Sequence, residues 1–237
     1  MIEFKSLFIM SEKICVCIQA RLSSKRLPEK VLRKVNEFNL LELLRKRLLK
    51  AKKPSQIYIL TSNDPSDNKL VKFCEKKGFK FFRGELNNVY KRFRDFLKVH
   101  NYQAIARISA DSPLLDHKIL VNMTKLFLKN NFDIVTNVFP KTFPSGQSVE
   151  IIHRKCFISL SPNRLNKSQK EHVTQYFYEN HKSYKILNET CDYDHLNMKL
   201  SIDSREDFNK LKKNFLYNKI DADSSIEEIL RKWNKIK

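Results

Sequence analysis

The sequence predicts an α/β protein built on a mostly parallel, doubly wound β-sheet, with an antiparallel excursion in its second half. Two observations predict this class. Up to Asn137, short apolar runs typical of strands buried on both faces alternate with amphipathic helical patterns. After Asn137 the alternation breaks, and a stretch with prolines and a glycine leads into an apolar run that we expect to pair antiparallel. We expect residues 1–237 to form a single domain, with residues 138–190 as the excursion.

The elements of the first half follow from apolar spacing and from helix start and stop signals. Continuous apolar runs predict strands at residues 13–18, 56–61, 79–82, 104–109 and 133–137. Apolar residues at helical spacing predict helices at residues 40–51, 64–77, 87–100 and 116–131. Asp64-Pro65 is a typical helix start, and Gly78 is a typical helix end.

The predicted elements of the second half are shorter. The antiparallel strand is expected at residues 148–152, and further strands at residues 183–187 and 197–203. Helices are expected at residues 154–160, 170–181, 205–216 and 225–234. Ser204 precedes the third of these helices, and Asp207 three residues later would complete a capping box.

Composition limits the class of protein. A hydrophobic content of 41% excludes a disordered chain. The net charge of +20 raises nucleic-acid binding as a less favoured alternative function. The densest basic stretch, residues 31–53, alternates with leucines at helical spacing, so we expect it to be the solvated face of a helix. Because no recognition-helix, zinc-finger or base-stacking pattern accompanies it, we expect no nucleic-acid partner.

The cysteines and the N-terminus bear on location. Five cysteines without a Cys-x-x-Cys pair argue against disulfides and zinc, and Cys15 and Cys17 fit a buried strand. The sequence contains no apolar run of membrane-spanning length and no signal-peptide pattern. We therefore expect a cytoplasmic protein without membrane insertion, in which residues 1–12 are a loose extension and Met10 is an alternative start.

Two charged loops follow strands at the edge where parallel sheets bind ligands. Residues 19–30 place cations and hydroxyl groups close together, as a polyphosphate site requires. In the loop after residues 104–109, Asp111 is a candidate metal ligand and Asp116 is a helix cap.

A third loop begins at Asp203, which would lie at the end of the strand predicted at residues 197–203. Mg²⁺ is typically held by one or two carboxylates, with phosphate oxygens and waters completing its coordination. Asp111 and Asp203 are therefore candidate Mg²⁺ ligands.

Several motifs together resemble a known family. The run CIQARLSSKRLPEKVL resembles the N-terminal signature of the cytidylyltransferases that activate acidic sugars. The likeness continues in order through GELNNVYKRF, ARISADSPLLD, FPSGQSVEII, KEHVTQYFYEN and LSIDSREDFN, and covers roughly residues 13–217. The family includes the acylneuraminate and 3-deoxy-manno-octulosonate cytidylyltransferases. Within it the chain most resembles the SpsF-like spore coat polysaccharide biosynthesis proteins.

The resemblance implies a nucleotide-diphospho-sugar-transferase-like fold, CTP as donor and Mg²⁺ as cofactor. The implied reaction transfers CMP from CTP to a nonulosonic or octulosonic acid, with release of pyrophosphate, for surface polysaccharide biosynthesis. A homodimer formed through residues 138–190 is also implied. The alternative is another nucleotidyltransferase or a glycosyltransferase on the same fold, with a different nucleotide or acceptor.

By matching position, the resemblance also implies the site residues. The implied catalytic residues are Arg21, Lys30 and Asp111, and the implied metal ligands are Asp111 and Asp203. The implied nucleotide contacts are Gln19, Ala20, Arg21, Ser23, Ser24, Lys25, Arg26, Arg107 and Ser109. The implied sugar contacts are Gln147, Glu150, Glu171 and His172.

Some features of this implied site stay open. The cation for the sugar carboxylate could be Arg107, His172 or Lys170, and His172 also fits a residue that packs or caps at a helix start. The likeness departs at Ser23 and Glu29, where members of the family usually have glycine.

Overall fold

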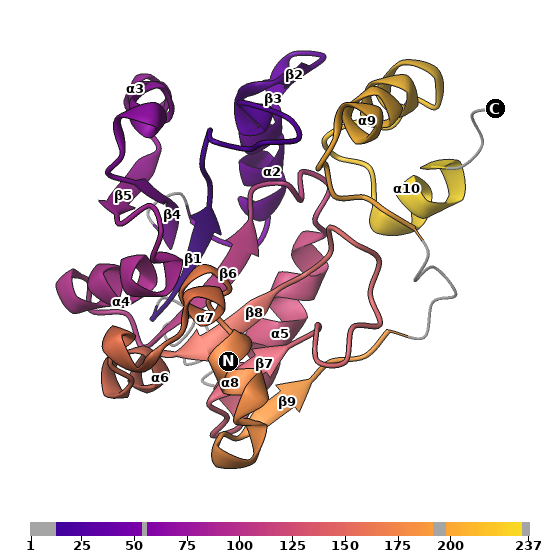
Figure 1. The fold of residues 1–237 in the computed structure, drawn as a ribbon. Helices are drawn as coiled ribbons and strands as arrows, with labels where there is room; N and C mark the ends of the chain where they lie inside the picture. Colours follow the sequence, from indigo (N-terminus) through magenta and orange to yellow (C-terminus); the bar gives the residue numbers. More distant parts are fainter. Residues whose placement is uncertain (1–12, 54–55, 192–197, 234–237) are drawn as a thin grey trace.

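A seven-stranded sheet lies at the centre of the computed structural model, which describes residues 13–53, 56–191 and 198–233 (Figure 1). In the spatial order β5-β4-β1-β6-β8-β7-β9, the strands are β5 (Lys80–Gly84), β4 (Ile57–Ser62), β1 (Ile14–Gln19), β6 (Ala104–Ser109), β8 (Glu150–His153), β7 (Ile134–Thr136) and β9 (Ile186–Asn188). Strand β8 runs antiparallel to both of its neighbours, and the other pairings are parallel. The predicted fold class is therefore confirmed, and the excursion contributes β8 and β9 to the same sheet.

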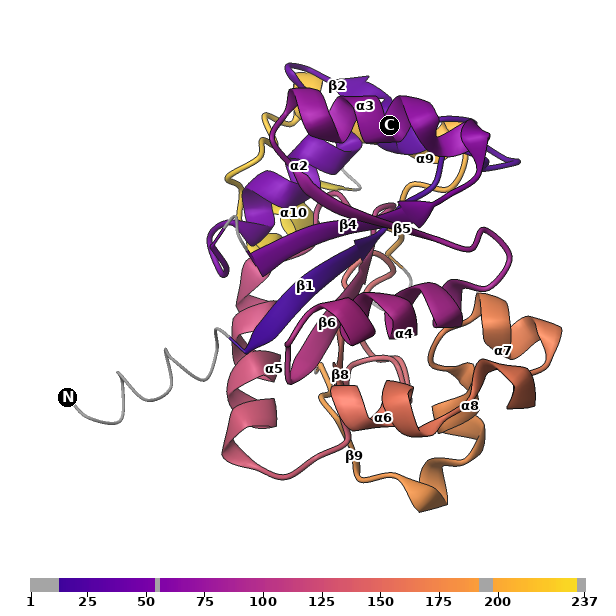
Figure 2. The same ribbon diagram turned by 90° about the vertical axis from the view of Figure 1, so that its left-hand side faces the viewer.

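Helices cover both faces of this sheet. The buried core of one face includes α2 (Leu40–Leu48), α3 (Asn68–Lys76) and α5 (His117–Lys129). The core of the other face includes α4 (Val89–Val99), α6 (Arg154–Ser159) and α8 (Gln175–Glu179). Figure 2 shows α3 and α4 on opposite sides of the sheet. Each residue of β1 from Ile14 to Ile18 is fully buried, which explains its uninterrupted apolar run.

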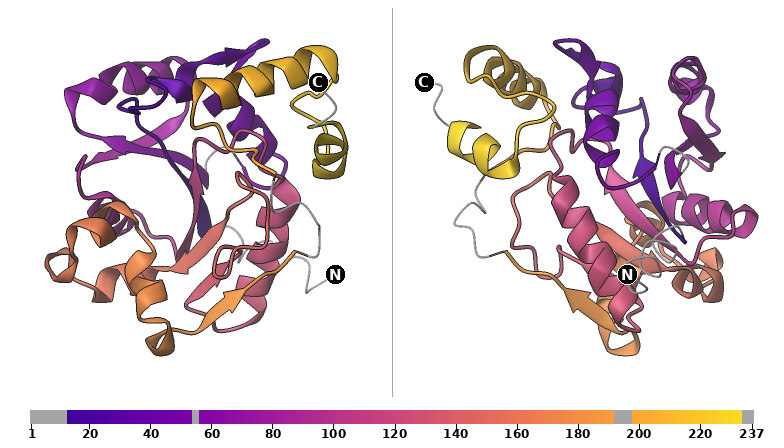
Figure 3. Two further views of the ribbon diagram at one scale, coloured as in Figure 1. Left: turned by 45° about the vertical axis from the view of Figure 1, so that its right-hand side comes forward. Right: turned by 180° about the vertical axis from the view of Figure 1, so that it is seen from behind.

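A third core lies at the carboxyl end of the chain. It joins α9 (Arg205–Tyr217) and α10 (Ile226–Trp233) to the apolar side chains of a hairpin formed by β2 (Lys34–Val35) and β3 (Phe38–Asn39). Figure 3 shows α9 and α10 far from α7 (Lys167–Glu171) and α8. The hairpin was not predicted, because strands of two residues leave no measurable periodicity.

The described residues also contain the short 3₁₀ helices η1 (Lys30–Leu32), η3 (Pro65–Asp67), η4 (Pro162–Arg164) and η5 (His181–Ser183).

Two predicted elements are wrong. The helix predicted at residues 170–181 is two short helices, α7 and α8, because His172 leaves the helical conformation with ψ 85°. Val173 at this break is fully buried, so tertiary packing favours the interruption. The strand predicted at residues 197–203 is reduced to a single bridge between Lys199 and Ser145 within the described residues.

The basic stretch is not wholly a solvated face either. Arg47 is buried, and its guanidinium donates to the carbonyl oxygens of Leu115, Ala222 and Ser224 at 2.9–3.1 Å. It thereby joins α2 to two distant segments. Lys52 is also buried.

The remaining predictions concern the termini and the thiols. The alternative start at Met10 and the extension at residues 1–12 lie outside the described residues. All five cysteines carry free thiols, and Cys15 and Cys17 are buried in β1 as predicted. Within the described ranges, no helix combines the length and the apolar character that a membrane span requires.

Candidate active site

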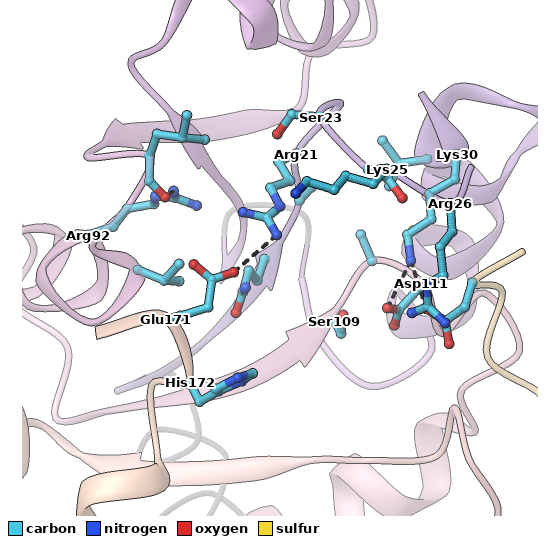
Figure 4. Close-up of a pocket in the computed structure, with 18 of the residues that line it drawn as sticks. Arg21, Ser23, Lys25, Arg26, Lys30, Arg92, Ser109, Asp111, Glu171 and His172 are labelled. Carbon is cyan, nitrogen blue, oxygen red and sulfur yellow. Dashed lines mark hydrogen bonds and ion pairs between the residues drawn. The ribbon is translucent and has the colours of Figure 1, made fainter. Parts of the chain in front are cut away.

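A cavity of about 650 Å³ lies at the carboxyl ends of β1 and β6 (Figure 4). Fourteen of the sixteen residues predicted for the site line it: Gln19, Ala20, Arg21, Ser23, Ser24, Lys25, Arg26, Lys30, Arg107, Ser109, Asp111, Glu171, His172 and Asp203. The loops after β1 and β6 meet there because Gln19 and Ser109 are paired in neighbouring parallel strands. Gln147 and Glu150 do not line the cavity.

The loop after β1 is held in place by a buried carboxylate. Asp67 is fully buried, and its two oxygens accept from the backbone N–H groups of Leu22 at 2.7 Å and Ser62 at 3.1 Å. The backbone of Ala20 also donates to Leu60 at 3.1 Å. These contacts fix where the loop leaves the sheet, so its cations face the cavity from a defined position.

Glu29, where the family usually has glycine, adopts a backbone conformation that glycine favours. Glu29 has φ +53°, a left-handed conformation that costs a non-glycine residue about 1 kcal/mol. Its backbone N–H donates to Leu22 at 3.1 Å. The turn that follows places Lys30 in η1. Ser23 has no positive φ and needs no glycine.

Lys30 bridges the two candidate metal ligands. Its ammonium nitrogen lies 3.1 Å from Asp111 Oδ2, 3.2 Å from Asp203 Oδ1 and 3.0 Å from the carbonyl oxygen of Ile202. Asp203 is in a loop rather than at a strand end. The loop is tethered by the Ile202 N–H, which donates to the Asp111 carbonyl at 2.8 Å.

The charge of Asp203 is stabilised by its neighbours. Partial burial alone would raise its pKa, but Lys30, Lys199 and Arg26 together hold the pKa below its ordinary value. The residue after it, Ser204, caps α9 in the predicted capping box with Asp207.

Arg21 and Glu171 form an ion pair at 3.0 Å that connects the loop after β1 to the end of α7. Figure 4 shows this pair across the cavity from Lys30 and Asp111. His172, at the break after α7, lines the same cavity. The interruption between α7 and α8, which was not predicted, is therefore the place where His172 lines the cavity.

Arg107 is held by a buried carboxylate. Its guanidinium donates to Gln19 Oε1 at 3.0 Å and to Glu150, which lies directly opposite in β8 and is 3% exposed. The phenol of Tyr178 donates to Glu150 at 2.5 Å. Burial raises the pKa of Tyr178 well above its ordinary value, so the phenol keeps the proton that it donates. Glu150 therefore orients Arg107 from behind instead of facing the cavity.

Gln147 stabilises the loop after β6 through hydrogen bonds to its backbone. It is fully buried, its side-chain N–H donates to the Leu114 carbonyl at 3.0 Å, and its side-chain oxygen accepts from the Asp116 N–H at 2.9 Å. It supports the loop that carries Asp111. Asp116 caps α5 as predicted, accepting from the Lys118 N–H at 2.9 Å.

One charged residue of the cavity, Arg92 of α4, was not predicted from the sequence. This residue is 1% exposed and donates to the Glu85 carbonyl at 2.7 Å, while its Nε has no hydrogen-bond partner among the described residues. Arg92 packs closely against the backbone of Gly84, where a Cβ would lie 2.7 Å from Arg92 Cγ. An arginine among the apolar residues of a helix gives no sign in the sequence that it also lines a cavity.

Replacing Arg92 with methionine is expected to raise the KM for CTP, the donor that the motif resemblance implies, about tenfold, because it removes the charged donor that orders the Glu85–Leu86 backbone at the cavity. Steady-state kinetics measures the change. Arg94→Met is the matched control, since Arg94 is two residues away and donates to Phe157 at 3.1 Å. An unchanged KM in a folded Arg92→Met protein would contradict this role.

The lining carries a marked excess of positive charge. Six Lys and Arg side chains face three carboxylates, those of Asp111, Glu171 and Asp203. Cations at the carboxyl edge of a parallel sheet, with hydroxyl groups and two nearby carboxylates, form a site for a polyphosphate. The fold and the site thus define a nucleotide-binding α/β protein.

Comparison with known proteins identifies the family. The chain belongs to the cytidylyltransferase family, whose model matches residues 15–232. It is a CTP-dependent nucleotidyltransferase, and its fold is that of the nucleotidyltransferases.

Three relatives illustrate the similarity. An uncharacterised protein of Methanocaldococcus jannaschii is 36% identical over 83% of this chain and 80% of its own length. The spore coat polysaccharide biosynthesis protein SpsF of Bacillus subtilis is 29% identical over 94% of each chain. The structure of a cytidylyltransferase from Leptospira borgpetersenii has a TM-score of 0.86 at 30% identity, covering 94% of this chain and 98% of that one.

Proposed function

We propose that the chain transfers CMP from CTP to an acidic sugar, with release of pyrophosphate, in surface polysaccharide biosynthesis. The observation that carries the proposal is the cation-rich cavity, which offers more positive charge than its own carboxylates neutralise. The similarity to SpsF, a spore coat polysaccharide biosynthesis protein, supports the polysaccharide context. The motif resemblance to the acidic-sugar cytidylyltransferases supports the acceptor class.

The acceptor is proposed to bind where the cavity meets a second groove. A groove of about 530 Å³, lined by Phe139, Ser168, His172, Thr174, Gln175, Tyr178 and Glu179, shares His172 with the nucleotide cavity. An acceptor held at this junction would lie next to the nucleotide cavity, because His172 lines both spaces. Of the three candidate cations for its carboxylate, Arg107 and His172 line the cavity, whereas Lys170 lines neither space.

The chain's own cations carry out most of the proposed catalysis. Attack on the α-phosphate builds negative charge on the departing pyrophosphate. Arg21, Lys25 and Arg26 belong to the anchored loop and line the cavity, so they can hold that group and stabilise the developing charge.

Mg²⁺ is the proposed cofactor, and Asp111 and Asp203 would hold it. The residues fit such an ion, because two carboxylate oxygens and the Ile202 carbonyl already surround a cation, the Lys30 ammonium, at 3.0–3.2 Å. These are the hard oxygen donors that Mg²⁺ prefers. The described residues contain no cluster of three or more His, Cys, Asp or Glu suited to a metal, so phosphate and water would complete the coordination. Bound Mg²⁺ would neutralise charge on the triphosphate.

Pyrophosphate release with CTP tests the acceptor class. Octulosonic and nonulosonic acids are expected to support turnover, whereas the same sugars with the carboxyl group reduced to an alcohol are not, because these neutral sugars lack the carboxylate that the cations would bind. Turnover with the neutral sugars but not with the acids would contradict the proposal. Homodimer formation through residues 138–190, a cytoplasmic location and the absence of a nucleic-acid partner stay predictions.

A further inference from the structure

The ammonium group of Lys30 occupies a three-oxygen seat, which we define as Asp111 Oδ2, Asp203 Oδ1 and the Ile202 carbonyl oxygen. The three distances are 3.1, 3.2 and 3.0 Å. The side chains of Lys30, Asp111 and Asp203 are only 14%, 25% and 21% exposed. Solvent screening is therefore weaker here than at a surface ion pair, and the contact joins the loops that carry Asp111 and Asp203.

Two other cations lie beside Asp203 and are more exposed than Lys30. Arg26 lies 3.4 Å from Asp203 Oδ1, an oxygen of the seat, with its side chain 70% exposed, and Lys199 lies 3.6 Å from Asp203 Oδ2, outside the seat, with its side chain 44% exposed. Lys30 is the cation that contacts both carboxylates. It also lines the nucleotide cavity, so a rotation of its flexible side chain can carry the charge from the seat toward a bound phosphate.

We propose that Lys30 and a divalent cation compete for the three-oxygen seat, and that metal binding transfers the Lys30 ammonium from the seat to the phosphates of CTP. The inference rests on the proposed metal ligands. A divalent ion bound by Asp111 and Asp203 would lie within a few ångströms of the ammonium. At that separation the repulsion between the two cations is large in a partly buried site. The two cations therefore cannot occupy the seat together. When the divalent ion binds there, the Lys30 ammonium moves away, and its side chain is long enough to bring it to the phosphates in the same cavity.

The exchange gives Lys30 two successive roles. Before metal binding, its charge offsets the repulsion between Asp111 and Asp203 and keeps their loops in place. Afterwards it is a phosphate ligand. The two roles predict opposite effects of removing the amine: divalent-ion binding to the nucleotide-free protein becomes tighter, although a phosphate contact is lost.

Mn²⁺ binding to the full-length, nucleotide-free protein, measured by electron paramagnetic resonance of the free ion, tests this inference. Lys30→Met is expected to tighten Mn²⁺ binding about tenfold or more, because no ammonium then has to be displaced. Lys199→Met is the matched control, because it removes the same charge beside Asp203 but outside the seat. It is expected to change the affinity by no more than about threefold.

The outcomes separate the two proposals. If wild type binds Mn²⁺ and folded Lys30→Met binds it equally or more weakly, the exchange is wrong while the metal ligands stand. If Mn²⁺ binds only when CTP is present, the exchange in the nucleotide-free protein is wrong while the metal ligands stand. If neither protein binds Mn²⁺ even with CTP present, both the exchange and the proposed metal site are wrong. Lys30→Gln, which retains a hydrogen-bond donor without the charge, provides the same comparison if Lys30→Met does not fold.

Discussion

Asp203→Ala is expected to lower the kcat of pyrophosphate release by about 100- to 1,000-fold while the protein stays folded. The side chain is one of the two carboxylates of the proposed metal site, and Lys30 alone cannot replace a divalent charge. The fold should persist because the tether of this loop is a backbone hydrogen bond between Ile202 and Asp111, at 2.8 Å. A coupled pyrophosphate assay and a thermal unfolding curve measure the two properties.

The control for this prediction is Asp223→Ala. Asp223 is an exposed aspartate paired with Lys46 and Lys50 at the surface, so its replacement makes the same charge change away from the cavity. We expect it to keep normal turnover. If Asp111→Ala and Asp203→Ala both keep full turnover, the assignment of the metal site is wrong.

Gly146→Ala is expected to lower the free energy of unfolding by about 3 kcal/mol and the melting temperature by roughly 6–12 °C. Gly146 has φ +92°, and a Cβ there would lie 2.6 Å from the Ser201 backbone nitrogen and 2.7 Å from the Leu200 carbonyl carbon. Backbone atoms cannot rotate away, so the segment must shift. Since Asp203 lies two residues beyond Ser201, turnover should also fall. Calorimetry and the pyrophosphate assay measure the two effects.

Gly78→Ala separates backbone strain from steric contact. Gly78 also has a positive φ, +63°, but a Cβ there would meet no atom within 4 Å in the part of the chain that the structure describes. Its replacement should cost about 1 kcal/mol and leave turnover unchanged. Equal losses of stability in the two variants would show that the close approach at Gly146 is not what matters.

Local patterns in the sequence were sufficient for most of the fold. The apolar run of β1 and the helical spacing of α4 and α5 extend over enough residues to be recognised, and all three elements form as predicted. The break after Asn137 correctly predicted one antiparallel strand, β8. The hairpin of β2 and β3 and the division between α7 and α8 depend on single residues, such as the left-handed Asn36, and no period reveals them.

The site divided in the same way. The parallel-sheet rule placed the loops after β1 and β6 at one edge, so Arg21, Lys30 and Asp111 were predicted correctly as neighbours. The sequence pattern of β8 could not reveal that Glu150 is buried and contacts Arg107 without lining the cavity. The sequence also could not reveal that Gln147 is buried against residues 114 and 116, because these hydrogen-bond partners are distant from it in the chain.

The sequence by itself determined the mostly parallel sheet, the family resemblance and a cationic first loop, because each depends on residues that are close together in the chain. Only the tertiary structure decided how Asp203 reaches Asp111. Among the described residues, no strand of the sheet leads to Asp203. Instead, the backbone of residues 200–201 packs closely against Gly146, which has no side chain, and the Ile202 N–H donates to the Asp111 carbonyl. Such contacts join segments dozens of residues apart, and their geometry is set by the packed chain as a whole.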